Sequence, residues 1–161
     1  MNTLDGYSRR RKGEKMDYRD FAKDLLKRKN QLSSARQVLK EEIEELEREK
    51  YSCKTAALNA IPQSGSGACK YEDRLITIIA TLDDCRFRLR VVERELKMIE
   101  QGMSGLNDYY VQLLEGFFIH NTKGAADSLM SRFYKERSCL YADRSKALEA
   151  FTRSVYGVVL I

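Results

Sequence analysis

Leucines recur at heptad spacing along the first long stretch of the chain. Residues 17–57 contain no glycine or proline, and the repeat comprises Leu25, Leu32, Leu39, Leu46 and Cys53. Apolar residues at this spacing line one face of a helix and are typical of a coiled coil. The other apolar position of each heptad is poorer, because it holds Ala22, Lys29, Arg36, Ile43 and Lys50. The pattern therefore predicts a long helix that needs a better partner than a copy of itself.

A second stretch, residues 71–103, has a nearly uninterrupted apolar seam. Its positions alternate steps of three and four residues: Leu75, Ile78, Leu82, Cys85, Leu89, Val92, Leu96, Ile99 and Met103. The preceding residues 58–70 contain the only proline and two glycines, which indicates a loop. A loop this short predicts an antiparallel helical hairpin, and a parallel coiled coil between two chains fits the same periodicity. Because a hairpin leaves part of the second seam exposed, we expect a homo-oligomer, a dimer formed through the coiled coil.

The heptads stop where Gly102 and Gly105 follow each other closely, and this spacing predicts a hinge before a separate unit. Asn107 is expected to cap a helix, and Thr122 to cap a shorter one that follows. The apolar face of the first contains Tyr110, Val111, Leu114, Phe117 and Phe118, and that of the second Ala125, Ala126, Leu129, Met130 and Phe133. A third helix over residues 135–155 is expected to bury Leu140, Ala147, Leu148 and Phe151.

These patterns predict an all-α protein in which a long antiparallel coiled-coil helical hairpin precedes a small three-helix helix-turn-helix domain. The predicted parts are a flexible basic arm at residues 1–16, an oligomerising hairpin at 17–103 with its loop at 58–70, and the helix-turn-helix domain at 104–161.

The outer face of the third helix has the composition of a DNA-reading surface. With Leu140 directed inward, Ser138, Tyr141, Ala142 and Ser145 point outward, flanked by Lys135, Arg137, Arg144 and Lys146. Small side chains permit close approach to the major groove, hydroxyls bond phosphates or base edges, and basic groups neutralise phosphates. A solvated face is the alternative for an isolated amphipathic helix, and the position after a short helix and a tight turn favours DNA. Thr122 and Lys123, before the second helix, are added as candidate DNA contacts.

The stretch YKERSCLYADRSKAL, residues 134–148, places a serine two residues before an apolar anchor, an aromatic residue beside it, and then a basic residue followed by Ala-Leu. In residues 106–151 the chain resembles the promoter-reading C-terminal helix-turn-helix of sigma factors. It is more closely similar to phage transcriptional activators of the ArpU type, which control late genes of Gram-positive phages and prophages. The resemblance covers nearly all of residues 17–157, and it implies DNA binding through the third helix. Sigma-like modules usually have Leu-Gly or a close equivalent at the turn, whereas residues 130–134 contain no glycine.

Charge is concentrated at the start of the chain, whose net charge is +5. Residues 1–16 contain five Lys or Arg against two acidic residues. They are expected to form an arm that adds phosphate contacts or enters a minor groove, and a tail without function, with Met16 as the natural start, is the alternative.

Catalysis and metal binding have little support in the sequence. The four cysteines, Cys53, Cys69, Cys85 and Cys139, form no C-x-x-C pair, and His120 is the only histidine. We interpret Cys53 and Cys85 as apolar fillers and His120 as a helix-end residue. No cofactor, metal or enzyme activity is expected, and no stretch is apolar enough to span a membrane.

The function predicted is therefore sequence-specific regulation of phage or prophage transcription in the bacterial cytoplasm, with double-stranded DNA as partner and RNA polymerase as a further candidate. A helical assembly protein whose C-terminal module packs against another protein is the alternative.

Overall fold

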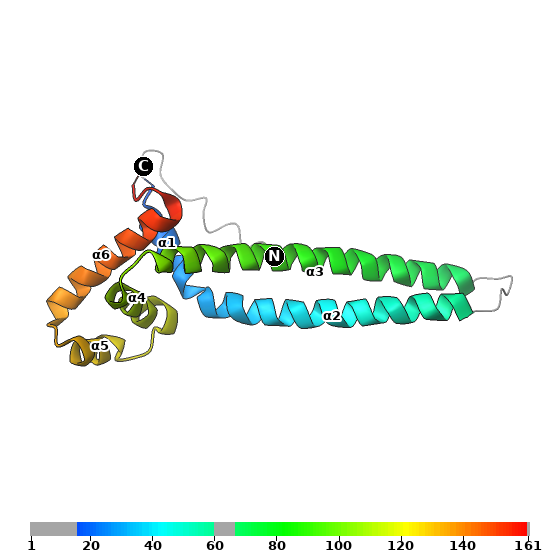
Figure 1. The fold of residues 1–161 in the computed structure, drawn as a ribbon, viewed down its shortest axis with the longest axis horizontal. Coiled ribbons are helices and arrows are strands. Elements are labelled where there is room, and N and C mark those ends of the chain that lie inside the picture. The colour runs from blue at the N-terminus through cyan, green and yellow to red at the C-terminus, as the bar shows by residue number, and fades with distance from the viewer. Residues whose placement is uncertain (1–15, 60–66, 161) are drawn as a thin grey trace. The chain divides into compact units, whose positions relative to one another are not determined.

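The computed structural model describes residues 16–59 and 67–160, and this part of the chain is all-helical (Figure 1). The predicted arm, apart from Met16, and the centre of the predicted loop at 58–70 lie outside the described residues. The elements are α1 (Tyr18–Lys27), α2 (Lys29–Asn59), α3 (Gly67–Ser104), α4 (Asp108–Leu114), the π-helix η1 (Glu115–His120), α5 (Ala125–Phe133) and α6 (Arg137–Tyr156). No helix in these two ranges is long and apolar enough to cross a membrane.

The described chain divides into two compact units. Residues 28–98 form one, here called the helix-pair unit, and residues 16–27 together with 99–160 form the other, the terminal unit. This division differs from the predicted boundary at residues 103 and 104. It also joins α1, which was predicted to be the start of the hairpin, to the C-terminal helices.

In the helix-pair unit, α2 and α3 run antiparallel and side by side (Figure 1). Ion pairs connect the two segments at successive positions in opposite chain directions: Arg28 to Glu95 at 3.2 Å, Glu42 to Arg88 at 3.8 Å and Glu47 to Arg86 at 2.7 Å. Between the helices, Cys53, Ile78 and Leu82 form a buried cluster against which Ile43 and Leu46 pack. Cys85 is also fully buried, so the interpretation of Cys53 and Cys85 as apolar fillers is confirmed.

The C-terminal helices α4, α5 and α6 pack around Leu113, Leu129 and Leu140. The prediction for α6 is confirmed in detail, because Leu140, Ala147, Leu148 and Phe151 are all buried. Asn107 also caps α4 as predicted: its side-chain oxygen accepts a hydrogen bond of 2.8 Å from the backbone N–H of Tyr110. Such a bond satisfies one of the backbone donors that a helix start leaves unpaired.

The link between α4 and α5 differs from the prediction. After Leu114 the chain adopts a π-helix that ends at His120 and buries Phe118 and Ile119, of which Ile119 was not predicted. Thr122 does not cap α5, because α5 begins at Ala125 and its cap residue is Gly124 in the left-handed conformation. The backbone carbonyl of Thr122 instead accepts the N–H of Ala125 at 3.0 Å.

Helix α1 is separate from α2, although the sequence predicted one helix over residues 17–57. It ends at Lys27, and its buried residues Ala22, Leu25 and Leu26 belong to the terminal unit. There α1 packs against α6 and η1. The start of α1 also contacts the segment after α6, since the N–H of Tyr18 bonds the carbonyl of Val159 at 2.9 Å and Asp17 forms an isolated β-bridge with Leu160. The tertiary partners of Leu25 and Leu26 therefore override the continuous heptad pattern.

The segment around Gly102, which was predicted to be a hinge, begins as part of a helix. Helix α3 continues through it to Ser104, and Gly102 is buried. A Cβ at Gly102 would lie 2.5 Å from ring atom Cε2 of Phe151 and 2.5 Å from a methyl group of Val155. Gly102 thus permits close approach of α3 and α6 within the terminal unit.

Candidate nucleic-acid interface

A three-residue turn joins α5 to α6 and sets the direction of α6. Tyr134 adopts φ 51° and ψ 43° at the end of α5, a left-handed conformation in which glycine is usual. Its side chain is 96% exposed, so no packing holds it there. The turn continues with Lys135, whose N–H bonds the carbonyl of Met130 at 3.3 Å, and α6 begins at Arg137. Lys135, predicted as the start of the helix, therefore lies in the turn.

The predicted outer face of α6 is exposed. Ser138, Tyr141, Ala142 and Ser145 all lie at the surface, on the side away from buried Leu140. The hydroxyl of Ser145 donates to the backbone carbonyl of Tyr141 at 3.1 Å. The exposed face therefore combines small, hydroxyl and aromatic groups, as predicted from the sequence.

Several of the predicted basic contacts have acidic partners within the protein. Lys135 lies 2.6 Å from Asp143, and the hydroxyl of Tyr109 donates to the same carboxylate oxygen at 2.9 Å. The hydrogen bond from Lys135, followed by that from Tyr109, lowers the pKa of Asp143 below its ordinary value, so this carboxylate stays charged. Burial of Tyr109, together with its bond to Asp143, raises the pKa of the phenol. This network ties the turn and α4 to α6.

Arg137 and Lys146 also have acidic neighbours. Arg137 pairs with Asp127 of α5 at 3.2 Å, and both side chains are mostly exposed. Lys146 lies 4.0 Å from Asp143. Exposed pairs of this kind contribute little to stability and exchange with external ions. Arg137 and Lys146 are thus accessible, but the neighbouring carboxylates partly neutralise their positive charge.

Arg144 is held differently from the other predicted cations. Its guanidinium lies 4.6 Å from the ring centre of Tyr141 and 5.2 Å from that of Phe117, and the two rings are 5.5 Å apart. Stacking on aromatic faces orients an arginine without neutralising its charge. Among the described residues, no carboxylate forms an ion pair with Arg144. It is the predicted cation best placed to receive an external anion.

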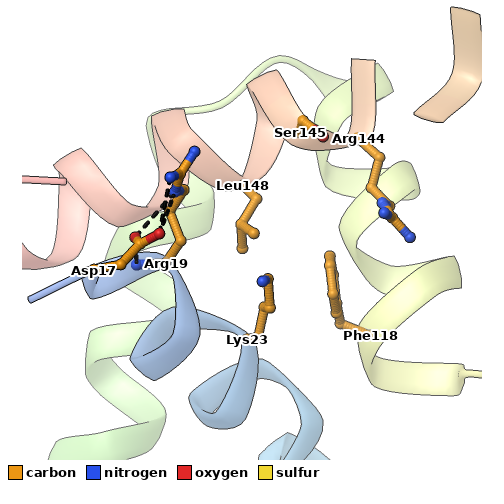
Figure 2. A pocket seen from close by; sticks show the side chains of 7 residues that line it. All are labelled: Asp17, Arg19, Lys23, Phe118, Arg144, Ser145 and Leu148. Carbon is orange, nitrogen blue, oxygen red and sulfur yellow. Dashed lines mark hydrogen bonds and ion pairs between the residues drawn. The ribbon is translucent and has the colours of Figure 1, made fainter. Parts of the chain in front are cut away.

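A pocket of about 410 Å³ opens beside Arg144, between α1, η1 and α6 (Figure 2). Figure 2 shows Lys23 and Leu148 directed toward its middle, with Arg19 and Arg144 on opposite sides. The lining residues are Asp17, Arg19, Lys23, Phe118, Arg144, Ser145 and Leu148. Of the predicted site residues, only Arg144 and Ser145 line it.

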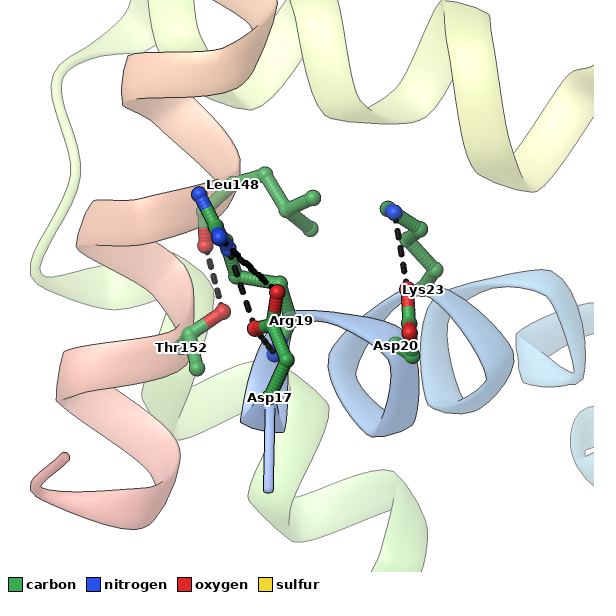
Figure 3. A network of polar contacts seen from close by, with 6 residues as sticks. All are labelled: Asp17, Arg19, Asp20, Lys23, Leu148 and Thr152. Atoms are coloured by element: carbon green, nitrogen blue, oxygen red, sulfur yellow. Dashed lines mark hydrogen bonds and ion pairs between the residues drawn. The ribbon is translucent and has the colours of Figure 1, made fainter. Parts of the chain in front are cut away.

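The α1 side of the pocket contributes two cations that the sequence analysis missed. Arg19 forms a two-pronged pair with Asp17 at 2.8 to 3.0 Å, which lowers the pKa of that carboxyl group (Figure 3). Lys23 pairs with Asp20 at 2.9 Å on an exposed face. Both lie in residues 17–103, which were predicted to form the hairpin. The sequence could have assigned Arg19 and Lys23 to the site only if the packing of α1 on α6 had been known.

The remaining predicted contacts lie apart from this pocket. Thr122 and Lys123 are exposed in the link between η1 and α5, and Lys135, Arg137, Ser138, Tyr141 and Lys146 do not line the pocket. The site therefore consists of the exposed face of α6, with the pocket beside its middle turn. No group of three His, Cys, Asp or Glu side chains in the described ranges is arranged to hold a metal ion.

Comparison of the chain with protein-family models, with curated proteins and with solved structures found no match.

Proposed function

We propose that the protein is a sequence-specific, non-enzymatic DNA-binding regulator of phage or prophage transcription, acting in the cytoplasm of a bacterial host. In this proposal α5, the turn at Tyr134 and α6 are a helix-turn-helix module, and α6 is the helix that enters the major groove. The observation that carries the proposal is the exposed face of α6, where Ser138, Tyr141 and Ser145 are exposed. On the same helix, Arg144 stacks on the rings of Tyr141 and Phe117.

Geometry and composition support α6 as the reading helix. It follows the nine-residue helix α5 after a short turn, as the second helix of such modules does. Ser138 and Ala142 are small enough to let the helix approach the floor of the groove. The hydroxyls of Ser138 and Tyr141 are groups that can bond base edges or phosphates.

The phosphate contacts are assigned to the pocket side of α6. Arg144 carries a charge without an ion-paired carboxylate in the described part of the chain, and Arg19 and Lys23 face the same pocket. A backbone phosphate over this pocket would meet Arg144 and the hydroxyl of Ser145. It would meet Arg19 and Lys23 only in competition with their partners Asp17 and Asp20. Lys135 and Arg137 rank lower, because they do not line this pocket and each also pairs with an aspartate.

The α2 and α3 pair is proposed to be a coiled-coil hairpin for oligomerisation, and RNA polymerase is proposed as a further partner. The neutralised charges of Lys135 and Arg137 favour one alternative, in which α6 packs against a protein in a helical assembly. The experiment below separates the two.

We expect Arg144→Ala to weaken binding to all DNA sequences and to lower the slope of log affinity against log salt by about one unit. The reason is the loss of one phosphate-neutralising charge. Binding is measured by fluorescence anisotropy on genomic fragments at several salt concentrations, and circular dichroism checks that the variant folds. Arg144→Lys should keep most of the slope, because it keeps the charge.

The matched control is Arg153→Ala on the last turn of α6, where Arg153 pairs with Glu149 and lies away from the pocket. It should leave both affinity and slope unchanged. A folded Arg144→Ala variant that binds as tightly as the parent would contradict the phosphate contact. A parent protein without any salt-dependent binding would favour the assembly alternative.

A further inference from the structure

The outer face of α3 carries an unexpected apolar stripe. Ile76, Ile79, Phe87 and Val91 are 64%, 39%, 58% and 43% exposed, and the small residue Ala80 is exposed among them. At 100° per residue these positions share one side of the helix. The stripe is about 22 Å long at 1.5 Å per residue.

This stripe is distinct from the seam that packs on α2. The seam residues Ile78, Leu82 and Cys85 are buried, and they lie on the opposite side of α3. Self-association was expected from the sequence because part of that seam would remain uncovered by α2. In the helix-pair unit α2 covers much of this seam. Within that unit, an uncovered seam therefore gives little reason for self-association. The apolar surface left on α3 is on its other side.

Charges along the stripe change sign from one end to the other. Glu72 and Asp73 precede Ile76, whereas Arg90 and Arg94 accompany and follow the apolar residues at the far end. At the middle, Asp83 lies 4.0 Å from Arg86, so both signs are present there. A stripe with one acidic end, one basic end and a mixed centre is complementary to itself only when two copies run in opposite directions.

We propose that a second copy of this chain covers the outer face of α3, with the two α3 helices antiparallel. Ile76 and Ile79 of one copy then face Phe87 and Val91 of the other, and Ala80 leaves room for the phenyl ring. Each acidic end lies beside the basic end of the partner helix. A parallel arrangement would instead oppose acid to acid and base to base, which costs affinity. The inference stands independently of DNA binding.

The first test is the mass of the full chain in solution, measured by sedimentation equilibrium. The parent should be a dimer at micromolar concentration. Phe87→Glu and Ile76→Lys should each raise the dissociation constant by about tenfold or more, since each replaces an apolar contact with a charge that faces like charges of the partner. The matched control is Val38→Glu, which replaces an apolar residue of α2 that is 60% exposed and should leave the dimer intact. A monomeric parent at tens of micromolar overturns the proposal, and so does a dimer that both α3 variants leave unchanged.

Charge reversal decides the direction of pairing. Replacing Glu72 and Asp73 with lysine, or Arg90 and Arg94 with glutamate, should weaken the dimer in each case. The chain that carries all four changes should recover the parent's dissociation constant, because complementary ends face each other again. Positions 72 and 90 are 18 residues apart on one helix, about 27 Å, so this recovery requires a second copy. Failure to recover, with circular dichroism showing intact helices, overturns the antiparallel arrangement.

Discussion

Replacing Phe151 with alanine is expected to lower the free energy of unfolding of the terminal unit by about 3–5 kcal/mol. Phe151 is the largest fully buried side chain of the described residues, and its ring lies against Gly102 of α3. Truncation removes the transfer free energy of the ring and leaves a cavity that the packed helices only partly fill. Hydrogen exchange of α6 amides, followed by mass spectrometry of the full chain, measures the effect.

The control for this change is Tyr51→Ala on α2, where the aromatic side chain is 71% exposed. Its removal should change the protection of α2 amides by less than about 0.5 kcal/mol, as is usual for surface positions. Unchanged exchange of α6 in Phe151→Ala would show that α3 and α6 do not share a core in solution.

Gly102→Ala is expected to destabilise the terminal unit by about 1–3 kcal/mol, the usual cost of overpacking. Two effects oppose each other at this position. Alanine favours a helix over glycine by about 1 kcal/mol. The new methyl group, however, would lie 2.5 Å from side-chain atoms of both Phe151 and Val155, and Phe151 is fully buried. Steric conflict therefore outweighs propensity, and urea unfolding monitored by circular dichroism should show a lower midpoint.

Gly105→Ala is the matched control for this prediction. A Cβ at Gly105 would meet only the hydroxyl oxygen of Ser154, at an ordinary 3.7 Å. This change should be neutral or slightly stabilising. If both glycine variants were instead equally stable and equally sensitive to protease at residues 102–105, the segment would be the hinge that the sequence predicted.

Local patterns in the sequence predicted much of the fold. The all-α class, the cap at Asn107 and the buried side of α6 followed from apolar spacing and helix-start chemistry, because these depend on neighbours within one or two turns. The burial of Cys53 and Cys85 followed in the same way. Exposure of Ser138 and Tyr141 was then a consequence of placing Leu140 inside.

Features that depend on distant residues were missed. Nothing near Arg28 signals a helix break, and α1 is separated only because Leu25 and Leu26 pack in the terminal unit. The left-handed conformation of Tyr134 could not be predicted, since a tyrosine rarely adopts it. Gly102 looked like a hinge because its role depends on Phe151, which lies 49 positions later in the chain.

The sequence predicted that the candidate site lies on one face of α6, but it did not predict which cations of that face are paired with carboxylates. The sequence contains Asp127 and Asp143, yet only the packing of α4, α5 and α6 shows that they neutralise Arg137 and Lys135. The same packing stacks Arg144 on two rings and brings Arg19 and Lys23 to its pocket. The ranking of the cations for phosphate binding therefore comes from tertiary structure alone.

The most direct measurement of the proposed DNA contact is a site-specific photo-crosslink from α6. Benzoylphenylalanine in place of Tyr141 puts a crosslinking group on the exposed face of α6, and the same substitution at Tyr51 puts it on α2. With bound genomic fragments, position 141 should crosslink to DNA bases, and position 51 should not. A complex that binds DNA but crosslinks from position 51 and never from position 141 would contradict the assignment of α6 to the major groove.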